Sequence, residues 1–168
     1  MHGRPHRERL KETALANARL ASREMHTMND AALVYPMLAM VVLTAYVLSA
    51  LFLRRTRAVK EGRLSSRYFR VYQGETEPDE AAKATRHFAN LFEAPVLFYV
   101  ACVTAIATRQ VTPLAVVLAW AYVALRVAHA YIHLGANRLR QRIPVYFASW
   151  GVLLALWITI ALRVAWAS

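Results

Sequence analysis

The sequence predicts an all-α integral membrane protein built as a four-helix bundle. The chain has 168 residues, of which 58% are hydrophobic, whereas about half is usual for a soluble domain. The apolar residues gather in four long runs, and each run is long enough for a helix to cross a hydrocarbon core about 30 Å thick. Lysine and arginine residues cluster beside these runs, as they do at the ends of membrane helices.

The first two membrane helices are separated by a long basic loop. The first helix is predicted over residues 31–53 and ends at an arginine pair that begins with Arg54. Pro78, followed by two acidic residues, is typical of a helix start. The second helix therefore begins there and continues to about residue 107, with a bend at Pro95 that opens room in the bundle.

The third and fourth helices follow short turns. A threonine before Pro113 is typical of a helix cap and first turn, so the third helix is predicted from there to about residue 134. A basic turn over residues 135–142 comes next. Pro144 is predicted to open the fourth helix, which reaches about Trp166.

The composition limits the domain organisation and the partners. Residues 1–27 form a polar arm, either a surface helix or disordered, and residues 28–168 form one domain. The single cysteine, Cys102, excludes an internal disulfide, which fits a bacterial inner membrane, the location we favour, or an organelle membrane. The net charge is +11. Because the cations flank apolar runs, anionic lipid rather than nucleic acid is the expected partner.

The distribution of positive charge predicts the orientation. Lysine and arginine residues favour the cytoplasmic side. The loops after the first and third helices carry eleven of them, and the opposite side carries four near the membrane. We therefore expect both basic loops in the cytoplasm and both termini outside.

Polar residues inside the predicted membrane helices form two stripes on the same side of the bilayer. Such residues are costly in a membrane and indicate a functional site. Spacings of three and four place each set on one helix face. The second helix carries Arg86, Asn90 and Glu93, and the third carries Tyr122, Arg126, His129 and His133. Their depths predict one polar cavity that opens to the cytoplasm.

The charges of this cavity favour an anionic ligand with an ammonium group. Arginine binds carboxylates through two parallel hydrogen bonds, and Glu93 could hold an ammonium. Glutathione offers two carboxylates, an ammonium and a thiol, and a nearby arginine lowers the pKa of a thiol. Other anionic amphiphiles fit the same charges. The spacing of His129 and His133 also suits a metal, but Arg126 one turn away disfavours a cation, so no metal is predicted.

The motifs resemble those of the MAPEG family (membrane-associated proteins in eicosanoid and glutathione metabolism). The stretch from Arg86 to Pro95 resembles the second helix of the family, with its arginine, asparagine and glutamate. Arg126-Val127-Ala128-His129, with His133, Gly135 and Arg138 after it, is similar to the third helix of the prostaglandin synthase branch. Arg54-Arg55 resembles the pair that ends the first helix in the leukotriene branch. The resemblance covers about residues 30–165.

The resemblance implies a homotrimer that binds glutathione between subunits near the cytoplasmic face. It implies a glutathione transferase or peroxidase acting on lipophilic electrophiles or lipid hydroperoxides. An arginine near the start of the fourth helix would stabilise the thiolate, and Arg142 is favoured over Arg140. The residues implied to line the glutathione are Arg54, Arg55, Arg86, Asn90, Glu93, Arg126, His129 and His133.

Two departures and two other functions stay open. His133 stands where a tyrosine is frequent in the family, and Ala94 replaces another tyrosine. A non-catalytic membrane scaffold of the same fold is one alternative to an enzyme. A small proton-coupled multidrug exporter is the other, although Arg86 and Arg126 would repel cationic drugs.

Overall fold

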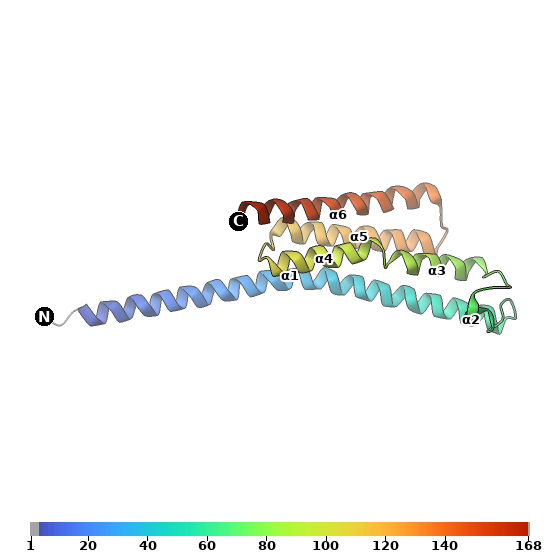
Figure 1. The fold of residues 1–168 in the computed structure, drawn as a ribbon, viewed down its shortest axis with the longest axis horizontal. Coiled ribbons are helices and arrows are strands. Elements are labelled where there is room, and N and C mark those ends of the chain that lie inside the picture. The colour runs from blue at the N-terminus through green and yellow to red at the C-terminus, as the bar shows by residue number, and fades with distance from the viewer. Residues whose placement is uncertain (1–3, 168) are drawn as a thin grey trace.

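The structure of the chain, a computed structural model, describes the backbone of residues 4–167 and the side chains of residues 31–166 together with Asn17. α3 and α4 follow each other nearly end to end, and α5 and α6 run alongside them (Figure 1). No strand occurs between residues 4 and 167, which confirms the predicted all-α class. The helices are α1 (Arg4–Lys60), α2 (Tyr68–Val71), α3 (Asp79–Asn90), α4 (Ala94–Ala107), α5 (Pro113–Leu134) and α6 (Leu139–Ala167).

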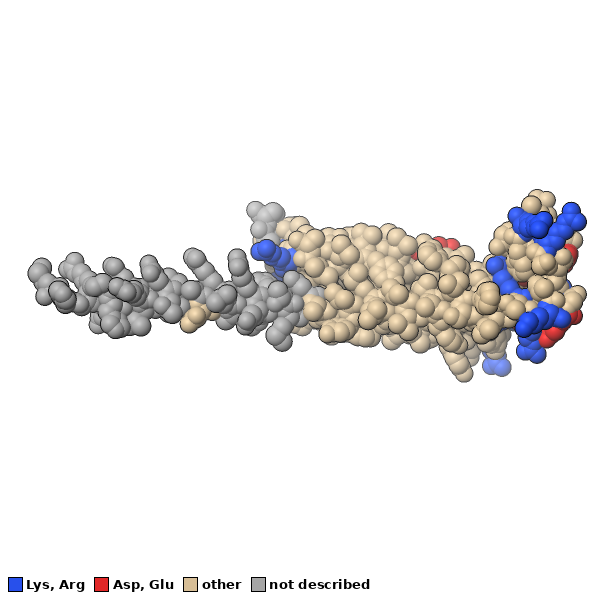
Figure 2. All heavy atoms as spheres, turned by 90° about the horizontal axis from the view of Figure 1, so that it is seen from below, with Lys and Arg blue, Asp and Glu red and all other residues tan. Residues whose placement is uncertain are grey.

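The described residues contain four helical segments that are long and apolar enough to cross a membrane, which confirms the predicted four-helix membrane protein. Both basic loops lie at the same end of the bundle, where lysines, arginines and acidic residues gather (Figures 1 and 2). Most of the flank between the two ends carries no charge (Figure 2). The four segments are Ala31–Lys60, Asp79–Ala107, Pro113–Leu134 and Leu139–Trp166.

The first helix ends later than predicted, at Lys60 instead of residue 53. Arginine and lysine are good helix formers, so a run of charge marks the end of the apolar run but does not stop the helix. The stop comes at Gly62, which adopts a φ of 69°. The Arg63 amide then donates to the Ala58 carbonyl at 2.9 Å and closes the helix end. The predicted arm, residues 1–27, lies outside the described side chains except Asn17, and the division at residue 28 stays a prediction.

The fourth helix begins earlier than predicted, at Leu139 instead of Pro144. Pro144 lies inside α6, in its second turn. The residues before it include arginine, leucine and glutamine, which favour helix, and a proline this close to a helix start removes few hydrogen bonds. The predicted turn over residues 135–142 is therefore shortened, and Arg140 and Arg142 belong to a helix.

The buried core of the bundle contains two stacked aromatic rings. Phe98 of α4 and Tyr122 of α5 lie 4.6 Å apart between ring centroids at an angle of 14°, and both are fully buried. Ala101 and Ala105 of α4 and Ala119 of α5 are also fully buried, and small residues of this kind let membrane helices approach closely. The outer faces expose large apolar side chains, as a lipid-facing surface requires.

Candidate functional site

The site begins at a break in the second membrane segment. α3 ends at Asn90 and α4 begins at Ala94. Pro95 is the second residue of α4; it has no amide hydrogen, and its ring excludes the carbonyl four residues earlier, that of Leu91. The break leaves the Asn90 carbonyl without a helical donor. The buried guanidinium of Arg126 fills this role, because its Nη2 donates to that carbonyl at 3.1 Å.

Asn90 connects Arg126 to Glu93. The Asn90 side-chain oxygen accepts a second hydrogen bond from Arg126 Nη2 at 3.1 Å, and its Nδ2 donates to Glu93 Oε2 at 3.1 Å. Arg126 is 0% exposed, whereas Glu93 is exposed on the single chain. The three side chains thus form one polar connection from the interior of the bundle to its flank.

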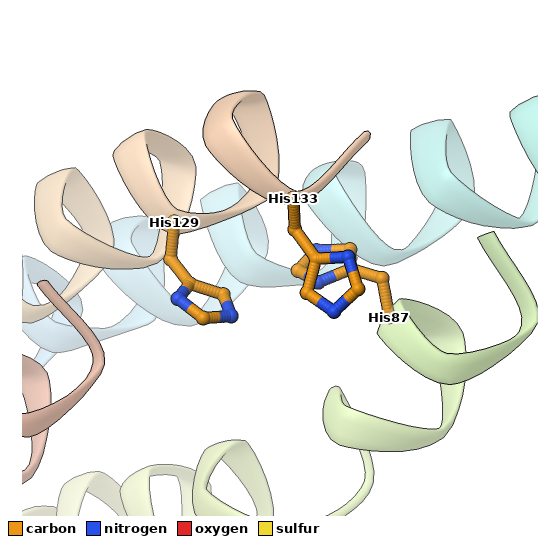
Figure 3. Close-up of side chains that lie close together, drawn as sticks. All are labelled: His87, His129 and His133. Atoms are coloured by element: carbon orange, nitrogen blue, oxygen red, sulfur yellow. The ribbon is translucent and has the colours of Figure 1, made fainter. Parts of the chain in front are cut away.

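Three buried imidazoles lie close together (Figure 3), and one of them, His129, is one turn from Arg126 on α5. His87 comes from α3, and His129 and His133 come from α5. The His87 ring centroid lies 5.5 Å from that of His129 and 5.0 Å from that of His133, and the latter two lie 5.6 Å apart. The sequence prediction missed His87. Its signal was available, because His87 continues the buried face of α3 that Ala81 and Ala84 also occupy.

α6 adds Arg142 and Tyr146 to the three histidines and Arg126, and these six residues form the cluster. Arg142 Nη1 lies 3.2 Å from His133 Nε2 and donates to Asn137 Oδ1 at 2.7 Å. Tyr146, which the sequence prediction also missed, places its ring 5.5 Å from the His129 ring and 6.0 Å from the Arg126 guanidinium carbon. Arg140 is exposed at the surface, so of the two arginines weighed for the thiolate, Arg142 is the one in the cluster.

Other predicted site residues lie elsewhere in the single chain. Arg54 donates to the carbonyls of Glu80 and Leu134, both at 3.0 Å, and so ties α1 to α3 and to the end of α5. Arg55 is held by Glu77 and Thr85. Arg86 is exposed, and no ion pair joins it to a carboxylate within the described residues.

The cluster, together with Tyr122 of α5, is rich in buried polar atoms that lack a hydrogen-bond partner within the described residues. Seven buried side-chain nitrogen and oxygen atoms have no hydrogen bond within the described residues. A buried polar group without a partner costs about 1–3 kcal/mol, so such groups indicate contact with a ligand or water. The seven are both ring nitrogens of His87, Nδ1 of His129 and of His133, Nε and Nη1 of Arg126, and the Tyr122 hydroxyl.

The three histidines alone have a spacing that suits one metal ion, since each offers a ring nitrogen and these lie within 4.8 Å of one another. Two guanidinium groups count against a cation. Arg142 donates toward His133 Nε2, and Arg126 lies one turn from His129. The set as a whole, with two arginines and one carboxylate, is better matched to an anionic ligand that carries an ammonium group.

Comparison with known proteins shows the family of the chain. Neither the curated proteins nor the solved structures gave a match to the chain. The family model of the MAPEG family matches residues 33–162, which include every residue of the cluster. The chain therefore belongs to the MAPEG family.

Proposed function

We propose that the chain binds glutathione at the buried cluster and uses its thiolate on lipophilic electrophiles or lipid hydroperoxides. One observation carries the proposal: Arg126 is completely buried in a membrane helix, with two guanidinium nitrogens unpartnered within the described residues. A guanidinium in that position is suited to a carboxylate. The family, whose members include glutathione transferases and peroxidases, supports this choice of ligand.

The residues of the site match the functional groups of glutathione. Arg126 suits one of its carboxylates, and Glu93, which Asn90 orients, suits its ammonium. Arg142 suits the thiolate, because a nearby cation lowers the pKa of a thiol. In the transferase reaction the thiol proton leaves, the sulfur forms a bond to the electrophilic carbon, and the leaving group departs with the bonding electrons.

We also propose that the active form is a homotrimer. Glu93 and Arg86 are exposed on the single chain although both belong to a membrane-spanning segment. An ionised side chain facing lipid costs several kcal/mol. A neighbouring subunit that covers this face would remove that cost and would place Glu93 and Arg86 around a glutathione held between subunits.

The matched arginines of α6 give the test of catalysis. Arg142→Ala should lower glutathione-dependent turnover of a chromogenic electrophile about 100-fold or more, since it removes a donor at the developing charge. Arg140→Ala, an equal loss of charge at an exposed position of the same helix, should leave turnover within about two-fold. Equal activity in the two variants would contradict the role of Arg142. Glutathione binding without turnover of any electrophile or hydroperoxide would favour a scaffold.

A further inference from the structure

A second feature lies outside the cluster, between the end of α1 and the α2 segment. A groove of about 520 Å³ opens there. Its floor is one face of α1, because Phe52, Arg55, Val59 and Lys60 recur at helical spacing. The opposite wall is formed by Phe69 of α2 and by Tyr72, the residue that follows α2. The volume is within the range of small-molecule sites, and the walls are mainly apolar.

The aromatic wall of the groove is fixed by Arg55. Its guanidinium carbon lies 5.0 Å from the Phe69 ring centroid and 5.6 Å from that of Tyr72, which are cation–π distances. The same group donates to Glu77 Oε1 at 2.8 Å and to Thr85 Oγ1 at 3.0 Å. The side chains of Arg55 and Glu77 are only 20% and 9% exposed. The wall is therefore formed before any ligand arrives, and the charge of Arg55 is already compensated.

The two ends of the groove differ in polarity. Phe52 belongs to the last uncharged turn of α1 and is 68% exposed, so its end of the groove faces hydrocarbon. Lys60 lies eight residues further, roughly 12 Å along the helix at 1.5 Å per residue. It is exposed, and within the described residues no carboxylate lies within ion-pair distance of it. Its free charge thus stands at the height of the lipid headgroups.

We propose that this groove binds one anionic phospholipid. The acyl chain would lie against Phe52, Val59 and the aromatic wall, and the phosphate would contact Lys60. The polarity of the groove follows that of a phospholipid in the bilayer, with the apolar end toward the hydrocarbon and the cation toward the headgroups. Arg55, which the family resemblance implies as a glutathione residue, lines the groove, but none of the residues with an unpartnered buried atom in the histidine and arginine cluster does.

The test measures the phospholipid that stays with the purified full chain. The protein is reconstituted in vesicles of phosphatidylcholine mixed with phosphatidylglycerol, extracted in mild detergent and analysed by native mass spectrometry. Wild type should retain one phosphatidylglycerol per chain. Lys60→Gln should lower its retention about five-fold, as expected for one cation near an anionic headgroup. Val59→Trp, which fills the groove and keeps every charge, should lower retention at least as much.

Arg70→Gln is the matched control, because Arg70 is an exposed cation of α2 that does not line the groove. It should retain phosphatidylglycerol as wild type does. An equal loss of phosphatidylglycerol in Lys60→Gln and Arg70→Gln, with no effect of Val59→Trp, would show diffuse electrostatic attraction of anionic lipid instead of a defined site. Equal retention of phosphatidylcholine, or displacement of the phospholipid by added fatty acid, would also overturn the proposal.

Discussion

At the scale of single residues, a substitution of His87 distinguishes a role in ligand binding from a role in packing. It is fully buried, and neither ring nitrogen has a partner within the described residues. Replacing such a group by an apolar one of similar size is close to neutral or stabilising. In His87→Leu the free energy of unfolding in detergent should therefore stay the same or rise by about 1 kcal/mol. Glutathione affinity, measured by calorimetry, should fall about ten-fold because one ligand contact is lost.

A second outcome would contradict the binding role of His87. A variant that loses stability and binds glutathione as tightly as wild type would show that the ring only packs between α3 and α5. His133→Leu serves as a comparison, since His133 has a partner in Arg142. Its loss should destabilise the protein more, because it leaves Arg142 with Asn137 as its remaining contact.

Much of the site at this scale was predictable, and the reason is helical spacing. The stripe of Tyr122, Arg126, His129 and His133 is buried on one face of α5, as the spacing of three and four requires. The spacing could not show which neighbouring helix each side chain meets. The contact of His87 with His129 of α5, and that of Tyr146 with Arg126, depend on how the helices pack against one another. The spacing of residues along one helix carries no information on that packing.

At the scale of elements, the break between α3 and α4 positions the Asn90 carbonyl for Arg126. Pro95 causes this break, because a proline has no amide hydrogen to donate to the Leu91 carbonyl four residues earlier. In Pro95→Ala the helix can continue through residues 91–93 and draw the Asn90 carbonyl into its own hydrogen bonding. We expect slower amide hydrogen exchange over residues 91–94 and glutathione binding about ten-fold weaker. Unchanged exchange in the variant would assign the break to another cause.

The helix boundaries show where prediction from sequence ends. The start of α5 was predictable, since Thr112 accepts a hydrogen bond from the Ala115 amide at 3.1 Å and Pro113 follows it. The end of α1 and the start of α6 were not, because hydropathy marks where a helix leaves the hydrocarbon and not where it stops. The glycine at position 62 was the better signal for the end of α1.

At the scale of the whole molecule, both basic loops lie at one end of the bundle (Figures 1 and 2). The excess of lysine and arginine there predicts that this end faces the cytoplasm. Alkaline phosphatase fused after Ser168 should then be active in a bacterial host, and a fluorescent protein at the same position should stay dark. The reverse pair of results would place the C-terminus, and with it the opposite end of the bundle, in the cytoplasm.

Orientation matters for the proposed function because the cluster lies toward the basic end of α5. His133 is next to the last residue of that helix, and Arg142 lies near the start of α6. A cytoplasmic basic end would give glutathione direct access to the cluster, and lipophilic electrophiles would arrive through the bilayer. Neither access route requires the hydrophilic cosubstrate to cross the membrane.

Calorimetric titration of the purified protein with glutathione, in mild detergent, tests the central claim most directly. Arg126→Ala is the variant, and Arg138→Ala, which removes an exposed cation of the adjacent turn, is the control. Wild type and the control should bind saturably, and Arg126→Ala should bind at least about 30-fold more weakly, as expected for loss of a buried charge contact of about 2 kcal/mol or more. Absence of binding to wild type at millimolar glutathione, or equal affinity in Arg126→Ala, would contradict the glutathione site.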